Sequence, residues 1–145
     1  MSNLFLMFLM FCGGMAVALQ PSINARLAQK VGAYESSLVS FAVGTLAMLA
    51  VVLFSGRGGL RAIGGASWWE LTGGLLGAFF VTLTIVVVPR IGTVAVMAGV
   101  IAGQLVAGGI LDHLGLFGLR QVPIDGKRLA GMLLLAAGAA LVLRK

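Results

Sequence analysis

The chain has 145 residues, of which 60% are hydrophobic and 10% charged, with a mean hydropathy of +1.11 and a formal net charge of +6. Soluble domains have about 25% charged residues, so this composition excludes an ordinary soluble fold, and it is too apolar for a disordered chain. The basic residues stand singly or in pairs between apolar segments, which is typical of a membrane protein at anionic headgroups and speaks against nucleic-acid binding.

Long runs without a charged residue divide the chain into candidate membrane spans. The runs are residues 1–25, 36–56, 71–89, 91–111 and 129–143. A spanning helix needs roughly 20 apolar residues, which the first four runs provide. The fifth run is shorter, but the basic residues that flank it can extend its reach by snorkelling. The runs lack the alternating pattern of a transmembrane β-barrel.

These runs predict an all-α integral membrane protein with a single transmembrane domain over residues 1–145. The transmembrane helices are expected near residues 3–30, 35–55, 68–88, 91–111 and 127–144. Small residues recur four positions apart in several of these segments, and this spacing lets helix backbones approach closely in lipid. We therefore expect five helices packed into a bundle.

Turn and cap residues indicate where the first four helices begin and end. The first helix is expected to end near Gly32 in an αL cap. Ser67 and Glu70 have the spacing of a capping box at the start of the third helix. Pro89 and Arg90 are predicted to form a very short turn between the third and fourth helices.

The longest connection, residues 112–128, separates the fourth and fifth helices. It contains several large apolar residues, so we expect it to lie in the membrane interface. Asp125 is predicted to cap the fifth helix.

The positive charges are evenly divided between the two sides of the membrane. Five spans place the termini on opposite sides, so that one side carries Arg57, Arg61, Arg120, Lys127 and Arg128. The other side carries Arg26, Lys30, Arg90, Arg144 and Lys145. An excess of Lys and Arg in cytoplasmic loops sets orientation, and here there is none. This balance predicts insertion in both orientations and an antiparallel homodimer of ten helices; the alternative is one weakly biased orientation.

The first helix contains the most unusual polar segment of the chain. Pro21 cannot donate a hydrogen bond to the carbonyl of Val17, so the helix is expected to kink or open there, with Pro21 as a hinge. Gln20 and Asn24 are four residues apart and share a helix face. Polar groups at membrane depth are tolerated where they line a cavity or bond to neighbouring helices. Both residues are therefore substrate-binding candidates, with interhelical hydrogen bonding as the alternative.

Gln104 and Ser40 are further substrate-binding candidates. Gln104 lies about midway along the fourth run, and Gly108 and Asp112 continue its face at i+4 and i+8. Cavity lining and interhelical hydrogen bonding explain Gln104 equally well. The Ser40 hydroxyl could also bond to the backbone of its own helix.

Asp112 and His113 stand where the fourth helix is expected to end. The simplest interpretation is that they terminate this helix at the headgroups. The alternative is a gate or a site of proton coupling, since neighbours could share a proton and an unperturbed histidine titrates at about pH 6.5. His113 is the only histidine, and no predicted helix interior carries a carboxylate. We therefore expect neither an enzyme nor a metal or other cofactor.

Several collinear motifs resemble those of one known family. They read QPSINARL at 20–27, SFAVGT at 40–45, WW and GG within 68–74, PRIG at 89–92, and GQL followed by DHLG within 103–115. On these motifs the chain resembles the short five-helix branch of the drug/metabolite transporter superfamily, which is catalogued as inner-membrane exporters. The resemblance implies a bacterial inner-membrane transporter with dual topology. The related small multidrug resistance proteins exchange protons for cationic drugs on a glutamate of the first helix, and this chain has no acidic residue there.

The residues and the resemblance together predict a small-molecule transporter in the lipid of the inner membrane. It would work by alternating access as an antiparallel homodimer. The alternatives are a dual-topology ion channel and a structural membrane subunit that transports nothing. Saturable counterflow would favour the carrier, single-channel currents the pore, and co-purification with a larger complex the structural subunit.

Overall fold

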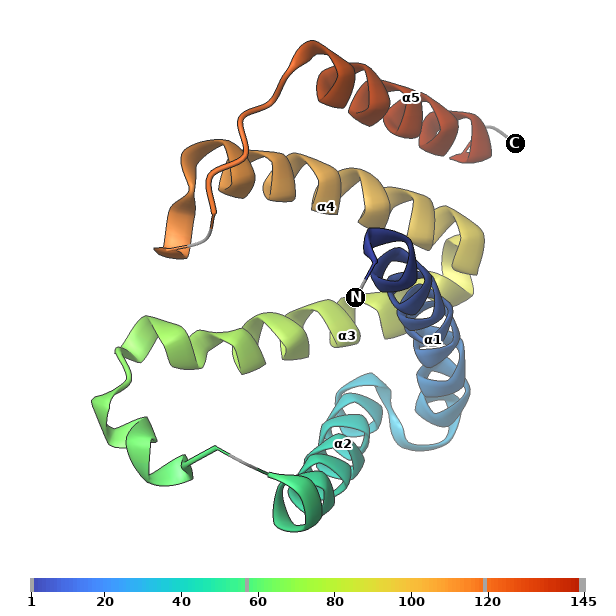
Figure 1. Ribbon diagram of the computed structural model, residues 1–145. Helices are drawn as coiled ribbons and strands as arrows, with labels where there is room; N and C mark the ends of the chain where they lie inside the picture. The colour runs from blue at the N-terminus through green and yellow to red at the C-terminus, as the bar shows by residue number, and fades with distance from the viewer. Residues whose placement is uncertain (1, 57, 119, 144–145) are drawn as a thin grey trace. The chain divides into compact units, whose positions relative to one another are not determined.

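The computed structural model describes residues 2–56, 58–118 and 120–143 (Figure 1). Its α-helices are α1 (Asn3–Val31), α2 (Ala33–Ser55), α3 (Gly73–Ile91), α4 (Thr93–Leu114) and α5 (Gly126–Leu143). The connections contain the short 3₁₀ helices η1 (Leu60–Gly65), η2 (Trp68–Thr72) and η3 (Leu116–Gly118). Arg57, Arg144 and Lys145, which enter the charge comparison, lie outside the described residues, as does the last residue of the helix predicted at 127–144.

Five helices in the described part of the chain are long and apolar enough to cross a membrane. In the third span η2 precedes α3 without a break, over Trp68–Ile91. These spans confirm the predicted all-α membrane fold. Large apolar side chains cover the outer faces of the helices, with Phe54 at 89% and Leu4 at 79% exposed. Such faces are suited to lipid or to another chain, because they are costly to expose to water.

Helix caps lie at several positions that the sequence marks. The backbone N–H of Ser67 donates to the Glu70 carboxylate at 2.6 Å in the predicted capping box, here at the start of η2. The N–H of Arg128 donates to the Asp125 carboxylate at 2.7 Å, so Asp125 caps α5 as predicted. Gly32 ends α1 as expected, but its φ of 100° and ψ of 159° lie outside the αL region.

The turn between α3 and α4 lies at Gly92, and its prediction at Pro89 and Arg90 was wrong. α3 continues through both residues to Ile91, since the fixed φ of proline is itself compatible with a helix. The chain instead turns at Gly92 with a φ of 84°, which glycine adopts without steric penalty. Gly32 forms a similar one-residue turn between α1 and α2. The ψ angle is 159° at Gly32 and 157° at Gly92.

Replacing Gly32 with alanine should destabilise the protein by about 1–3 kcal/mol, because a non-glycine residue is strained at this positive φ. The added Cβ would also lie against the Glu35 carboxylate. Thermal unfolding in detergent measures the effect. Gly13→Ala in α1 is the matched control, since its Cβ would meet nothing within 4 Å. A melting temperature for Gly32→Ala equal to that of the wild type would contradict the strain.

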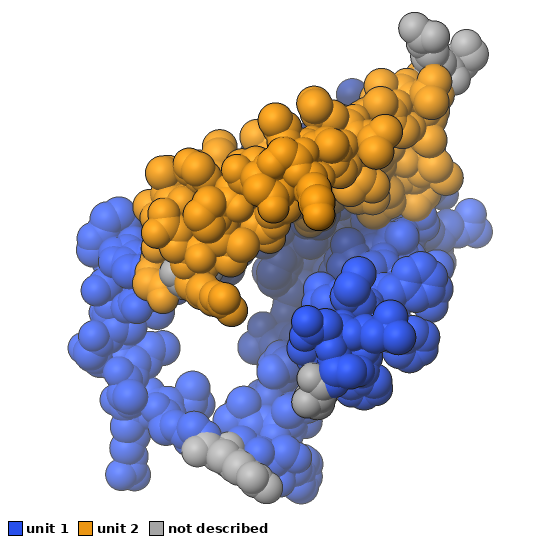
Figure 2. Space-filling model, turned by 45° about the horizontal axis from the view of Figure 1, so that its top comes forward, with its two compact units in different colours: residues 1–90 blue, residues 91–145 orange. Residues whose placement is uncertain are grey.

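The chain forms two compact units, residues 1–90 and 91–145, and each is described by itself (Figure 2). In the first unit α2 packs along α1 after the turn at Gly32. The buried residues of these two helices are small or polar, namely Pro21, Asn24, Ala25, Ser36 and Ser37. Small side chains let two helix backbones approach closely, which is how helices associate in lipid.

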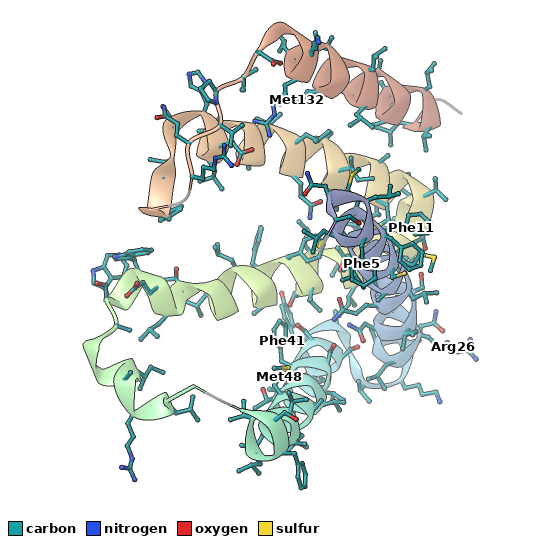
Figure 3. The ribbon with its side chains drawn as sticks, viewed as in Figure 1. Phe5, Phe11, Arg26, Phe41, Met48 and Met132 are labelled. Carbon is teal, nitrogen blue, oxygen red and sulfur yellow. The ribbon has the colours of Figure 1, made fainter. Side chains whose placement is uncertain are left out.

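In the second unit α4 and α5 pack side by side. Met132 of α5 (labelled in Figure 3) and Ile124 of the connection both lie over Gly109 of α4. A Cβ built on Gly109 would be 2.9 Å from Met132 Cε and 3.4 Å from Ile124 Cδ1. The absence of a side chain at Gly109 therefore lets α5 and the connection approach α4.

Candidate functional site

A hydrogen-bonded seam joins α1 to α2. The side-chain amide of Asn24 donates to the Ser40 hydroxyl at 3.1 Å, and the Ser36 hydroxyl donates to the backbone carbonyl of Asn24 at 2.8 Å. Asn24 is 6% exposed and Ser36 is fully buried. Ser36 and Ser40 are one turn apart on α2, so both can face α1. We call Asn24, Ser36 and Ser40 the polar seam.

α3 contacts α2 of this helix pair. The Thr82 hydroxyl donates to the hydroxyl of Ser37 on α2 at 2.9 Å. The Phe41 ring of α2 lies over Gly77 of α3, where an added Cβ would be 3.4 Å from the ring. α3 therefore contacts α2 next to the residues of the polar seam.

A groove of about 530 Å³ lies beside the polar seam, and we call it the α1–α2 groove. Its polar lining comes from Gln20, Ser40 and Thr45, and its apolar lining includes Phe41 and Met48 (both labelled in Figure 3). Gln20 is exposed, and the structure records no hydrogen bond between its side chain and any described residue. The Gln20 amide is therefore available to a solute in this groove.

The polar seam and Gln20 lie well inside the membrane-spanning segments. At 1.5 Å per residue, Asn24 and Ser40 are each about 10 Å from the helix ends that meet at Gly32. Gln20 is about 16 Å from the same end of α1. The hydrocarbon core is about 30 Å thick, so these groups lie at hydrocarbon depth. An amide exposed there is costly unless it meets water, a solute or a polar partner.

The two polar residues predicted to share a face of α1 have different surroundings. Asn24 is buried and bonds to α2, as the interhelical alternative expected, whereas Gln20 lines the groove. Between them, the Pro21 side chain is fully buried. α1 remains helical through Pro21, so the expected opening of the helix is absent. Burial of the proline ring between packed helices explains why the missing backbone hydrogen bond does not break α1.

A second groove, of about 370 Å³, lies between α4 and α5. Gln104, Gly108 and Asp112 all line it, so the face predicted from their spacing is the face that α4 turns toward α5. The Asp112 carboxylate forms an ion pair with the Arg128 guanidinium at 3.1 Å. The two side chains are 41% and 43% exposed, so the pair contributes only about 0–1 kcal/mol to stability. The ion pair also orients the Arg128 guanidinium, which donates a second hydrogen bond to the backbone carbonyl of Val122 at 3.0 Å.

The last turn of α4 holds the connection that leads to α5. The Val122 N–H donates to the backbone carbonyl of Asp112 at 2.8 Å, and the Ile124 N–H donates to His113 Nδ1 at 3.3 Å. The Gln121 side chain donates to the backbone carbonyl of His113 at 2.8 Å. An imidazole nitrogen accepts a hydrogen bond only while it is unprotonated, so the Ile124 contact requires a free lone pair on Nδ1.

Asp112 and His113 therefore have separate partners. The carboxylate turns to Arg128, whereas the imidazole turns to the Ile124 backbone. The sequence suggested that Asp112 and His113 share a proton. Sharing would require a hydrogen bond between their side chains, and the structure records none among the described residues. A gating or coupling role for this pair stays a prediction.

Sequence reasoning did not identify Ser36, Ser37, Thr45 or Arg128 as site residues. Small residues four apart at Ser36 and Ser40 were a usable signal, because such a stripe faces a neighbouring helix. Thr45 has no comparable signal. Arg128 was interpreted only as a headgroup anchor, since its ion pair with Asp112 depends on the path of a connection that sequence spacing does not define.

Comparison with known proteins relates nearly the whole chain to one family. The family described as "Putative inner membrane exporter, YdcZ" matches residues 5–141. Over 144 residues the chain is 30% identical to the inner membrane protein YdcZ of Escherichia coli (strain K12), and the match covers 94% of this chain and 93% of that one. No solved structure matches the chain. The similarity extends across both units, from α1 to α5.

Proposed function

The chain belongs to this family of inner-membrane exporters, and we propose that it moves a small metabolite by alternating access as an antiparallel homodimer. Family membership and the five apolar helices make it a multi-pass protein of the inner membrane. The family is described as one of exporters, which supports a transporter over an enzyme.

The observation that carries this proposal is the Gln20 amide in the α1–α2 groove. It lies at hydrocarbon depth beside the polar seam and has no recorded partner among the described residues. Polar groups in such positions mark solute pathways in membrane proteins, because lipid cannot satisfy their hydrogen bonds. Gln20 and the bonded pair Asn24 and Ser40 would therefore form the substrate-binding side of α1 and α2. In the second unit, Gln104 would be a substrate-binding residue of the α4–α5 groove.

The proposed hinge is Pro21, between Gln20 and Asn24. Its ring removes one backbone hydrogen bond of α1, so the carbonyl of Val17 lacks its usual i+4 donor. Bending at this point would change the exposure of Gln20 and leave the bonds between Asn24 and α2 intact. The gate would be the Asp112 and His113 end of α4, where hydrogen bonds of exposed groups hold the connection.

The antiparallel dimer is supported by the equal numbers of Lys and Arg on the two sides of the membrane. Transporters with inverted repeats build their central sites from two halves of opposite orientation. Two copies of this chain in opposite orientations would supply such halves without gene fusion.

C-terminal reporters that are active only in the cytoplasm or only in the periplasm should therefore both give signal. Adding two or three lysines at the N-terminus should drive most copies into one orientation, because the charge balance would then be broken. A matched variant with added glutamines controls for the extra length. A single orientation of the unmodified protein would contradict the dual insertion.

Alternating access is tested by the accessibility of residue 20 in co-expressed copies whose added lysines fix them in opposite orientations, with the cysteine in one orientation only. Cys12 is the only cysteine, so Gln20→Cys in a Cys12→Ala background carries one reactive group. A membrane-impermeant maleimide should label it from either side of sealed vesicles, and a bound solute should reduce labelling from one side. Labelling from one side only would contradict alternating access. Single-channel currents without saturable counterflow would instead favour the ion channel.

A further inference from the structure

None of the described residues that line the α1–α2 groove is charged, and we infer that the groove takes an uncharged solute with one polar end and one apolar end. This inference rests on the proposed function, because it assigns a substrate class to the same groove. It goes beyond that function by excluding organic cations and anions as preferred substrates.

The lack of charge follows from the helices that form the groove. Between Ser36 and Gly56 α2 carries no charged residue, and the basic residues of α1 lie beyond Asn24 toward its end. An ion that moves from water into the groove would lose hydration and meet no countercharge among the described lining residues. This transfer is strongly unfavourable. An uncharged polar group loses far less on entering and can recover its hydrogen bonds from the lining.

The polar side of the groove offers both donors and acceptors. The Gln20 amide can donate and accept, as can the Thr45 hydroxyl. Ser40 is more restricted, because its oxygen already accepts a hydrogen bond from Asn24. Its proton has no recorded acceptor among the described residues and can be donated to a solute oxygen. A hydroxyl or amide group of the solute satisfies this set.

The remaining walls fit an apolar body. Phe41, Met48 and Leu49 line the groove on α2, and an aromatic ring and a thioether both make favourable contacts with a flat hydrophobic group. The volume of about 530 Å³ accommodates a single-ring compound with a short side chain. The inferred class is therefore that of small neutral amphipathic molecules such as aryl alcohols.

The test uses three probes that share one ring and differ in the charge of the side chain. They are 2-phenylethanol, protonated 2-phenylethylamine and phenylacetate, each radiolabelled. Equilibrium dialysis at neutral pH measures saturable binding to the protein in lipid nanodiscs, with empty nanodiscs subtracted. The affinity for the neutral probe should exceed the affinity for either ion by roughly tenfold or more, because only the ions lose hydration that the groove cannot replace.

The Gln20→Glu variant should reverse this order. It keeps the side-chain shape and places a carboxylate in the groove, so the amine should gain affinity by roughly tenfold or more and the alcohol should lose affinity. Gln29→Glu is the matched control, since it makes the same change on α1 at an exposed residue outside the groove. It should leave the order of the wild type unchanged.

The outcomes separate the inference from the proposed function. Tighter binding of an ion by the wild-type groove would overturn the neutral substrate class while leaving the groove as the site. Two results would overturn the assignment of neutral solutes to this groove. One is probe binding that the Gln20→Glu variant leaves unchanged, and the other is the lack of saturable binding of any probe. The maleimide accessibility of residue 20 then decides independently whether α1 takes part in alternating access.

Discussion

Replacing Gln20 with alanine should abolish export without loss of stability. The side chain makes no recorded hydrogen bond to the described residues, so its removal should change the free energy of unfolding by less than about 0.5 kcal/mol. Its contact with the solute, in contrast, would be lost entirely. Counterflow of a labelled solute in proteoliposomes, chosen by a thermal-shift screen of uncharged metabolites, measures the activity. Thermal unfolding in detergent measures the stability.

Asn24→Ala provides the comparison, because Asn24 is buried and bonded to Ser40. Its loss should lower both export and stability, the latter by about 0.6–2 kcal/mol, as expected for a hydrogen bond between membrane helices. Asn24→Ala should still form a folded dimer. Wild-type counterflow by Gln20→Ala would remove Gln20 from the site. A stability loss in Gln20→Ala equal to that in Asn24→Ala would show a structural role for both residues.

Asp112→Asn and His113→Gln should each abolish accumulation of the solute driven by a pH gradient and should spare counterflow. No described helix interior holds a carboxylate, so proton coupling would use Asp112, His113, Glu35 or Glu70 at the membrane boundary. Of these, the neighbours Asp112 and His113 are the proposed coupling pair. Asn keeps the shape of Asp112 but removes the charge that pairs with Arg128. Gln at position 113 removes the imidazole that accepts a hydrogen bond from the Ile124 N–H. Proteoliposomes with an imposed pH gradient measure accumulation.

Asp125→Asn is the matched control for the coupling variants. Asp125 belongs to the same connection, but its carboxylate caps α5 rather than bonding to the end of α4. Asparagine is also a good cap, so this variant should keep both accumulation and counterflow. Accumulation at the wild-type level in both coupling variants would exclude the pair as the coupling site and leave a mechanism without protons.

The features predicted well from the sequence are those that depend on neighbouring residues. Charge-free runs define the spans, because a bilayer excludes charge over a fixed thickness. The caps at Ser67 and Asp125 depend on residues three positions apart. The shared face of Gln104 and Asp112 follows from helix periodicity alone.

The features that could not be predicted depend on how helices meet. The partner of Asn24 is Ser40, 16 residues away, and their contact depends on the packing of α2 against α1. The sequence showed Gln20 and Asn24 as equivalent neighbours on one face, and only the position of α2 separates a buried residue from a groove residue. The turn at Gly92 was missed because proline was given more weight than the positive φ that a one-residue reversal needs.

The single-residue turn at Gly32 has a consequence for how the chain enters the membrane. Because one residue joins α1 to α2, the ends that meet at Gly32 lie on the same side of the bilayer when both helices cross it. The orientation of α1 in the membrane therefore sets the orientation of α2. Arg26 and Lys30, close to the turn, act on that orientation together with the N-terminus, so charge added at either end of α1 reorients α2 as well.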